Sequence, residues 1–122
     1  MKFMKNKKKI YCFDLDNVIC TTKGNNYKKS TPKKKVVNFI NKLYEKNYYI
    51  KIFTARYMGR NNENISKAKR QGYLSTKKQL KLWKLKYHDL IFGKPSYDIF
   101  IDDKCYGFKK DWVNKMQKNL KI

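Results

Sequence analysis

Two aspartates, Asp14 and Asp16, directly follow an apolar run, and this feature most constrains what the chain can fold into. Residues 10–13 have the continuous apolar character of a strand that is covered on both faces. Ionised carboxylates at the end of a buried strand cost free energy unless a cation or hydrogen-bond donors receive them. The chain has only 9 acidic residues, so a pair at one strand end implies partners elsewhere in the chain.

The length and composition predict one globular domain. A chain of 122 residues can enclose one modest core, so we expect residues 1–122 to be a single domain with a basic tail at residues 1–8. Hydrophobic residues make up 41% and aromatic residues 16%, which favours a folded protein over a disordered one. The apolar runs are too short for a membrane span or a signal peptide. We therefore expect a cytoplasmic protein with no membrane partner.

The formal net charge of +22 points to an anionic partner. The cations are almost all lysine, and arginine occurs only at Arg56, Arg60 and Arg70. Because arginine is the residue preferred for bidentate phosphate and base contacts, we interpret most lysines as a solvated surface. A nucleic-acid partner remains an alternative, and an anionic substrate would be attracted by the field. The three cysteines lack a metal-binding or disulfide spacing, and His88 stands alone.

Periodicity and turn signals predict alternating strands and helices. Strands are expected at 9–14, 48–53, 90–92 and 97–101, with a hairpin or flap at 17–30. Thr31-Pro32 is typical of a helix start, and the apolar spacing that follows predicts a helix through about Lys46. We further expect a short helix at 64–70 ended by Gly72, a helix begun by a capping box at 76–79, and a C-terminal helix carrying Phe108, Trp112, Val113, Met116 and Leu120.

This order predicts an α/β fold, a three-layer Rossmann-like sandwich with a mainly parallel sheet of about four strands. In such sheets ligands bind beyond the carboxyl ends of the strands, and each expected strand ends in polar residues. These are Asp14 and Asp16, Thr54 and Arg56, Lys94, and Asp102 and Asp103. Four carboxylates favour a hard cation such as Mg²⁺, while threonine and lysine suit phosphoryl oxygens. Taken one at a time, these residues could equally serve as helix caps or surface charges.

The same four stretches carry a family resemblance. Phe13-Asp14-Leu15-Asp16-Asn17-Val18 resembles the first motif of the haloacid dehalogenase-like superfamily of phosphohydrolases, and Ile52-Phe53-Thr54 resembles the second. Gly93-Lys94-Pro95 and Ile99-Phe100-Ile101-Asp102-Asp103 resemble the third and fourth. The motifs occur in order and span about residues 9–115. One departure is Asn17-Val18, where family members often have Gly-Thr; asparagine also tolerates the backbone angles of a turn.

The resemblance implies a magnesium-dependent phosphatase with an aspartyl-phosphate intermediate. Asp14 would be the nucleophile and Asp16 the general acid/base, and both would be metal ligands together with Asp102 and Asp103. Thr54, Ala55, Arg56 and Lys94 would bind phosphate or substrate. Which of Asp102 and Asp103 binds the metal directly is left open.

The spacing leaves no room for a cap domain, so the site should be open or covered by another subunit of a homo-oligomer. The run from Thr54 to Arg60 and that from Gly93 to Asp98 resemble small capless phosphatases of surface-polysaccharide synthesis, which implies a sugar phosphate as substrate. Thr54-Ala55-Arg56 and Asp102-Asp103-Lys104 also resemble the phosphatase half of polynucleotide-kinase repair enzymes, which implies a polynucleotide end or a nucleotide. A non-catalytic binding module on the same scaffold is disfavoured because every expected side chain is present.

Overall fold

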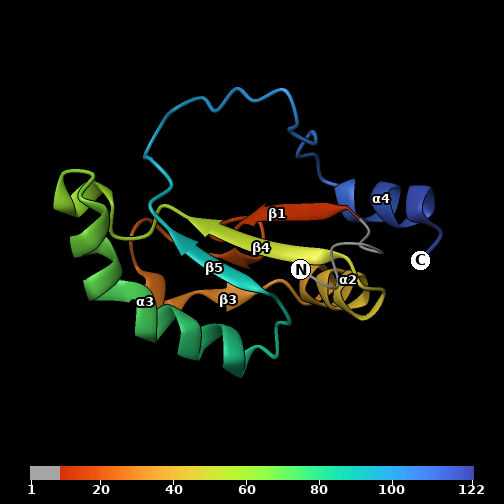
Figure 1. Cartoon of the computed structure of the whole chain (residues 1–122), viewed down its shortest axis with the longest axis horizontal. Helices are drawn as coiled ribbons and strands as arrows, with labels where there is room; N and C mark the ends of the chain where they lie inside the picture. Colours follow the sequence, from red (N-terminus) through yellow and green to blue (C-terminus); the bar gives the residue numbers. More distant parts are fainter. Residues whose placement is uncertain (1–8) are drawn as a thin grey trace.

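A three-stranded parallel sheet organises the chain. The structure, a computed structural model, describes residues 9–122, so the expected basic tail at 1–8 lies outside the described residues. Strands β1 (Ile10–Asp14), β4 (Tyr49–Thr54) and β5 (Asp89–Phe92) pair in the order β1-β4-β5 (Figure 1). Asp14 lies opposite Phe53, and Thr54 lies opposite Phe92. The three carboxyl ends therefore meet at one edge of the sheet, as the parallel α/β prediction requires.

The expected flap between the first strand and the first helix is present. It contains strands β2 (Cys20–Thr21) and β3 (Thr31–Pro32), which pair antiparallel, and a 3₁₀ turn, η1 (Tyr27–Lys29). Because Thr31 and Pro32 belong to β3, the prediction that they start a helix is wrong. Helix α2 runs from Lys34 to Glu45, and the amide of Lys33 donates to the carbonyl of Ile19 at 2.8 Å.

One long helix replaces the two short helices expected in the middle of the chain. After the 3₁₀ turn η2 (Gly59–Asn61), helix α3 runs without a break from Ile65 to Leu82. The sequence reasoning ended a helix at Gly72 and started another at Thr76, because glycine and threonine are common at helix ends. Both residues are instead buried in the interior of α3, where Gly72 lies against the ring of Tyr57 and Thr76 accepts from Arg56.

The fourth strand expected at 97–101 is not formed, and the sheet has three strands. The chain leaves β5 at Gly93 and runs in an extended arc beyond the β1 edge of the sheet to helix α4 (Trp112–Leu120) (Figure 1). Ile99 is 79% exposed and Ile101 91% exposed along this arc. Within residues 9–122, β1 pairs only with β4 along its length, so its other edge is open. We call residues 95–111 the crossing segment.

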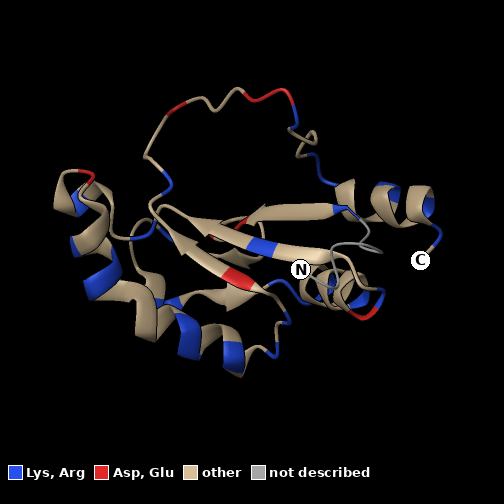
Figure 2. Ribbon diagram, viewed as in Figure 1, with Lys and Arg blue, Asp and Glu red and all other residues tan. Residues whose placement is uncertain are grey.

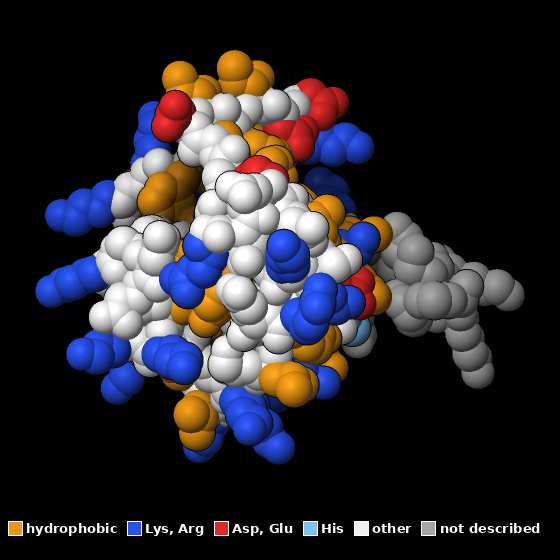
Figure 3. All heavy atoms as spheres, turned by 90° about the vertical axis from the view of Figure 1, so that its left-hand side faces the viewer, with side chains coloured by type: hydrophobic (Ala, Val, Ile, Leu, Met, Phe, Trp, Pro, Cys, Tyr) orange, Lys and Arg blue, Asp and Glu red, His pale blue; other side chains and the backbone are white. Residues whose placement is uncertain are grey.

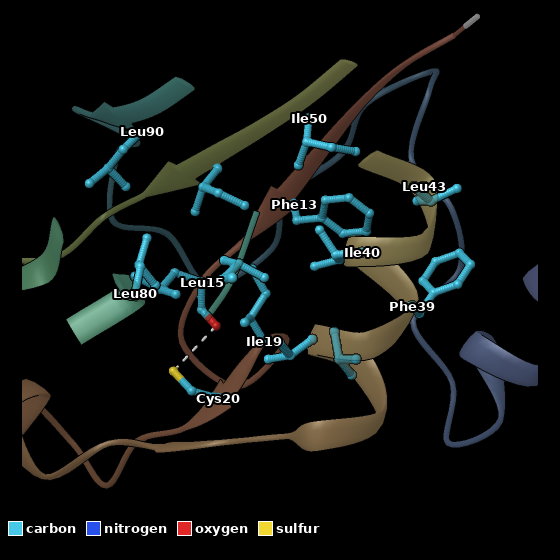
Figure 4. Close-up of a cluster of buried hydrophobic side chains, with 14 of the residues drawn as sticks. Phe13, Leu15, Ile19, Cys20, Phe39, Ile40, Leu43, Ile50, Leu80 and Leu90 are labelled. Carbon is cyan, nitrogen blue, oxygen red and sulfur yellow. Dashed lines mark hydrogen bonds between the residues drawn. The ribbon is translucent and has the colours of Figure 1, made fainter. Parts of the chain in front are cut away.

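The core fills the space between the sheet and α2. Figure 4 shows Phe13, Leu15 and Ile19 gathered with Ile40 and Leu43 of α2. The Sγ of Cys20 closes this cluster by donating to the carbonyl of Leu15 at 3.6 Å. Helix α4 adds Trp112, whose ring lies 5.9 Å from that of Phe39. Phe108, expected on this helix, precedes it and is 59% exposed. Among the described residues, no helix is long and apolar enough to cross a membrane.

Candidate functional site

Asp14 is the last residue of β1, and its carboxylate lies at the carboxyl edge of the sheet. Its Oδ1 accepts from the amide of Leu15 at 2.9 Å and lies 3.6 Å from the Nζ of Lys94. The Asp14 side chain is 33% exposed. Burial raises the pKa of Asp14 above its ordinary value, while Lys94 and the Leu15 amide act in the opposite direction. Asp14 is therefore reachable from solvent and oriented by two donors.

Asp16 forms a buried ion pair with Arg56. The Arg56 Nε lies 3.1 Å from Oδ1 and 3.0 Å from Oδ2, and Nη2 lies 2.9 Å from Oδ1. The hydroxyl of Thr22 in the flap also donates to Oδ1 at 2.6 Å. Asp16 leads into the turn that follows β1, in which Asn17 has the left-handed φ of 66°. An asparagine tolerates this angle.

Arg56 is only 2% exposed and is surrounded by other side chains. Besides Asp16, it donates through Nη1 to Gln79 at 2.7 Å and to Thr76 at 3.3 Å, and through Nη2 to Ser30 at 3.2 Å. The sequence reasoning assigned Arg56 to phosphate or substrate binding. In the structure it fixes the orientation of Asp16, because a guanidinium presents several N–H groups in a rigid planar arrangement.

The sequence reasoning missed the residues that surround Arg56. Thr76 and Gln79 had been interpreted as a capping box, yet they lie on one face of α3 and both accept from Arg56. Their spacing of three residues was the available signal, since residues three apart share a helix face. Thr22 and Ser30 gave no such signal; they meet only because the flap closes, with their hydroxyls 2.6 Å apart.

Thr54, Ala55 and Lys94 lie together where β4 and β5 end. Thr54 is fully buried, and its hydroxyl accepts from the amide of Arg56 at 3.1 Å. The amide of Lys94 donates to the carbonyl of Thr54 at 3.1 Å, which joins the two strand ends. Ala55 is partly buried and packs against the core. The sheet therefore brings Asp14, Asp16, Thr54 and Lys94 to one edge.

The ammonium group of Lys94 lies among two aromatic rings as well as Asp14. It is 5.2 Å from the ring centre of Tyr97 and 5.0 Å from that of Phe100. Burial acts to lower the pKa of Lys94, but Tyr97 and Asp14 outweigh it, so this pKa lies above its ordinary value. Lys94 is thus held as a cation beside Asp14, and the start of the crossing segment covers it.

Asp102 and Asp103 are not brought to the other site residues. Both are exposed on the crossing segment, where Oδ1 of Asp102 accepts from the amide of Lys104 at 2.9 Å. This bond lowers the pKa of Asp102 below its ordinary value. Within residues 9–122, no three histidine, cysteine or acidic side chains gather in a way that could hold a metal ion. The expected Mg²⁺ ligands are therefore not brought together in this arrangement of the described residues.

Charge is distributed unevenly around the site. Figure 2 shows lysine and arginine along α3, α2 and α4, and acidic residues on the crossing segment. The strands point toward the face shown in Figure 3, where positive side chains are scattered, most negative ones lie toward the top, and one negative patch lies at the right.

The fold and the site define a class, an α/β protein whose carboxylates and lysine meet at the carboxyl edge of a parallel sheet. Among solved structures, the chain is similar to a protein from Vibrio cholerae, with a TM-score of 0.76, 19% identity, and coverage of 93% of this chain and 99% of that one. It is also similar to part of the Pnkp1/Rnl/Hen1 RNA repair complex, with a TM-score of 0.50 and 16% identity. There it covers 95% of this chain and 32% of the other.

A second structure of the Pnkp1/Rnl/Hen1 complex gives a TM-score of 0.51 at 15% identity, with 34% of that chain covered. The chain thus spans about a third of the length of the repair-complex chains. No family profile matches the sequence. No curated protein matches it either. At these identities the structural likeness shows the fold, and the chemistry has to be argued from the site.

Proposed function

We propose that this protein is a phosphomonoester hydrolase in which Asp14 is the nucleophile. The observation that carries the proposal is the contact of Lys94 Nζ with Asp14 Oδ1 at 3.6 Å beside the buried Thr54. A cation next to a solvent-reachable carboxylate can receive the oxygens of a phosphate while the carboxylate attacks phosphorus. The positive charge at the same edge attracts the substrate.

The reaction takes place in two steps. An Asp14 oxygen bonds to phosphorus as the ester P–O bond breaks, and Asp16 donates a proton to the departing alkoxide. Water then attacks the aspartyl-phosphate and gives its proton to Asp16, and the acyl phosphate P–O bond breaks to release phosphate and free Asp14. Oδ2 is the oxygen of Asp16 suited to carry the proton, since among the described bonds it accepts only from Arg56 Nε, whereas Oδ1 also accepts from Thr22.

The proposed Mg²⁺ site requires the crossing segment to move. We propose that residues 99–101 add to the open edge of β1 and bring Asp102 and Asp103 beside Asp14, so that these carboxylates hold the ion together with the carbonyl of Asp16. Residues 93–98 can span about 20 Å when extended. The strand position beyond β1 lies about 14 Å from β5, so the chain reaches it if the added strand is short. Mg²⁺ would offset the repulsion among the carboxylates.

For the substrate, we propose a sugar phosphate of surface-polysaccharide synthesis. The open carboxyl edge and the absence of a cap among residues 9–122 support a substrate that needs no enclosing pocket. A polynucleotide end is the second candidate. It is favoured by the likeness to part of an RNA repair complex and by an arginine and two tyrosines that the fold brings together near Asp16.

The proposal is tested by hydrolysis of p-nitrophenyl phosphate with Mg²⁺ and with EDTA, followed by a panel of sugar phosphates, nucleotides and phosphorylated oligonucleotides. We expect phosphate release that depends on Mg²⁺ and on Asp14. Absence of release from every substrate under both conditions would refute the proposed hydrolase. Release that persists in Asp14→Asn would refute Asp14 as the nucleophile.

A further inference from the structure

Tyr27 of the flap, Tyr57 and Arg60 form a compact cluster, which we call the Tyr-Arg cluster; Tyr57 is buried, Tyr27 is partly buried and Arg60 is exposed. The two rings lie 4.9 Å apart between centroids. The guanidinium carbon of Arg60 lies 4.6 Å from the centre of the Tyr57 ring and 5.5 Å from that of Tyr27. Aromatic faces attract a guanidinium group and hold it flat. Arg60 is exposed, but its head group is therefore held in place.

Two energetically unfavourable features of the structure occur at Tyr57. Its φ of 67° lies in the left-handed region, which is strained for a bulky residue. Its ring also lies against Gly72 in the interior of α3, where an added Cβ would come within 2.2 Å of the ring. Glycine inside a helix is less favourable than alanine. Strain retained at one side chain in this way is typical of a functional position.

The Tyr-Arg cluster adjoins the catalytic residues through Arg56. The guanidinium carbon of Arg56 lies 5.0 Å from the centre of the Tyr27 ring, and the same guanidinium binds Asp16. Gln79 joins the two regions as well, since it accepts from Arg56 at 2.7 Å and donates to the carbonyl of Tyr27 at 2.9 Å. The ring of Tyr27 therefore contacts both Arg60 and Arg56, the arginine that orients Asp16.

Arg60 has hydrogen-bonding capacity left for an anion. In the part of the chain that the structure describes, Arg60 makes one hydrogen bond, from Nη2 to the carbonyl of Asn25 at 3.3 Å, and takes part in no ion pair. A guanidinium carries five N–H donors and binds phosphate oxygens in pairs. The two ring centres are only 4.9 Å apart, so the rings do not lie on opposite faces of the guanidinium, and N–H groups remain for such a ligand.

We propose that Tyr27, Tyr57 and Arg60 form a subsite for a second phosphate group of the substrate, distinct from the phosphate that Asp14 attacks. This inference rests on the proposed function and narrows its substrate class to compounds with two phosphate groups. The second group is either the phosphate of a sugar bisphosphate or a phosphodiester next to a phosphorylated polynucleotide end. Both present the same oxyanion to Arg60.

The test compares matched substrates with and without the second phosphate. One pair is a hexose monophosphate and the corresponding hexose bisphosphate; the other is a nucleoside 3′-phosphate and a dinucleotide 3′-phosphate. We measure kcat/KM for each with the wild type, Arg60→Ala, Arg60→Lys and Arg70→Ala. Arg70 is exposed on α3 and is the matched control, because its loss changes the net charge equally. The pair that the wild type favours identifies the source of the second phosphate.

We expect Arg60→Ala to reduce the preference for the second phosphate by about tenfold or more, as a charge-assisted hydrogen bond implies. Arg60→Lys should retain part of the preference, and Arg70→Ala all of it. An unchanged preference in Arg60→Ala, or an equal loss in Arg70→Ala, would overturn the subsite.

Equilibrium binding separates this inference from the proposed function. If the wild type hydrolyses none of the substrates, the hydrolase proposal fails. Isothermal titration calorimetry with the hexose bisphosphate and the dinucleotide 3′-phosphate still tests the subsite. Binding of either compound that weakens about tenfold in Arg60→Ala and not in Arg70→Ala supports it. Affinities that are equal in all variants, or binding of neither compound, would overturn it.

Discussion

The carboxyl edge of the sheet and the crossing segment both carry residues of the expected site, but they differ sharply in structure. At the edge, Thr54, Arg56 and Lys94 are 0%, 2% and 7% exposed and are joined by hydrogen bonds and ion pairs. On the crossing segment, Ile99 and Ile101 are 79% and 91% exposed. The edge residues are held by hydrogen bonds and ion pairs to their neighbours. The segment has ring contacts near its two ends: Tyr97 and Phe100 contact Lys94, and Phe108 contacts Lys33 and Trp112.

This difference shows that one part of a site can have its side chains fixed by packing while the other part is not yet in place. Paired strands fix backbone positions, so a side chain at a strand end is carried to a defined place. A segment without pairing has no such constraint, and few buried contacts oppose its movement. We therefore expect the edge to determine stability and phosphate binding, and the crossing segment to determine metal dependence.

The largest effect is expected from Asp14→Asn, which removes the nucleophile at the ordered edge. Turnover of p-nitrophenyl phosphate should fall by at least about 10³-fold, since loss of a covalent nucleophile leaves only binding effects. Asp98→Asn, on the crossing segment, is the control for loss of one carboxylate and should change turnover less than twofold. Circular dichroism should show the same fold in both variants. Near-normal turnover in Asp14→Asn would show that Asp14, at the carboxyl edge, is not the nucleophile.

Arg56→Ala tests whether the edge also determines stability. The substitution leaves the carboxylate of Asp16 and the amide of Gln79 without their buried partner, which typically costs about 3–5 kcal/mol. Urea unfolding should show this loss in the free energy of unfolding, with Arg70→Ala close to the wild type. Equal stability of the two variants would show that the ion pair with Asp16 contributes nothing to folding.

A pair of glycine substitutions compares the two regions directly. In Gly72→Ala the new Cβ would lie 2.2 Å from the Tyr57 ring, whereas at Gly107 on the crossing segment no atom lies within 4 Å. We expect Gly72→Ala to lower the free energy of unfolding by about 1–3 kcal/mol, as overpacking does. Gly107→Ala should change it by less than about 0.5 kcal/mol. If the order were reversed, the segment would be more tightly packed than its exposure indicates.

Hydrogen exchange tests the proposed movement of the crossing segment. The amides of β1 that point away from β4 should exchange about tenfold more slowly when Mg²⁺ is added, because an added strand would accept their hydrogen bonds. The double variant Asp102→Asn with Asp103→Asn should lose this protection at the same Mg²⁺ concentration. Unchanged exchange in the wild type at saturating Mg²⁺ would refute the added strand.

The smallest effect is a pH dependence of stability at Asp14. Burial raises its pKa above the ordinary value of 3.8, so between the two values the folded protein binds more protons than the unfolded chain. Stability is then full below the unfolded pKa and falls as the pH rises through the folded one. Asp14→Asn should therefore melt above the wild type at pH 7, with the difference shrinking toward pH 3. A difference that grows on acidification would mean that the pKa is lowered instead.

The sequence predicted those strands and turns that a short stretch of residues indicates by itself. Apolar runs ending in polar residues identified β1, β4 and β5, and turn residues identified the flap. The prediction of helix ends at Gly72 and Thr76 was wrong. Residues that are common at helix ends also occur inside a helix where an aromatic ring or a guanidinium packs closely against it. Tyr97–Ile101 has the pattern of a strand, but a strand also needs a partner, and the composition of a segment does not determine pairing.

By itself, the sequence determined that Asp14, Asp16, Thr54 and Lys94 lie at the carboxyl edge of a parallel α/β sheet, because each directly follows a strand. Tertiary structure alone decided that Arg56 turns inward to Asp16, that Thr76 and Gln79 receive it, and that Tyr27, Tyr57 and Arg60 meet. It also left Asp102 and Asp103 apart from the other carboxylates. These contacts join residues far apart in the chain, and their formation depends on how whole elements pack.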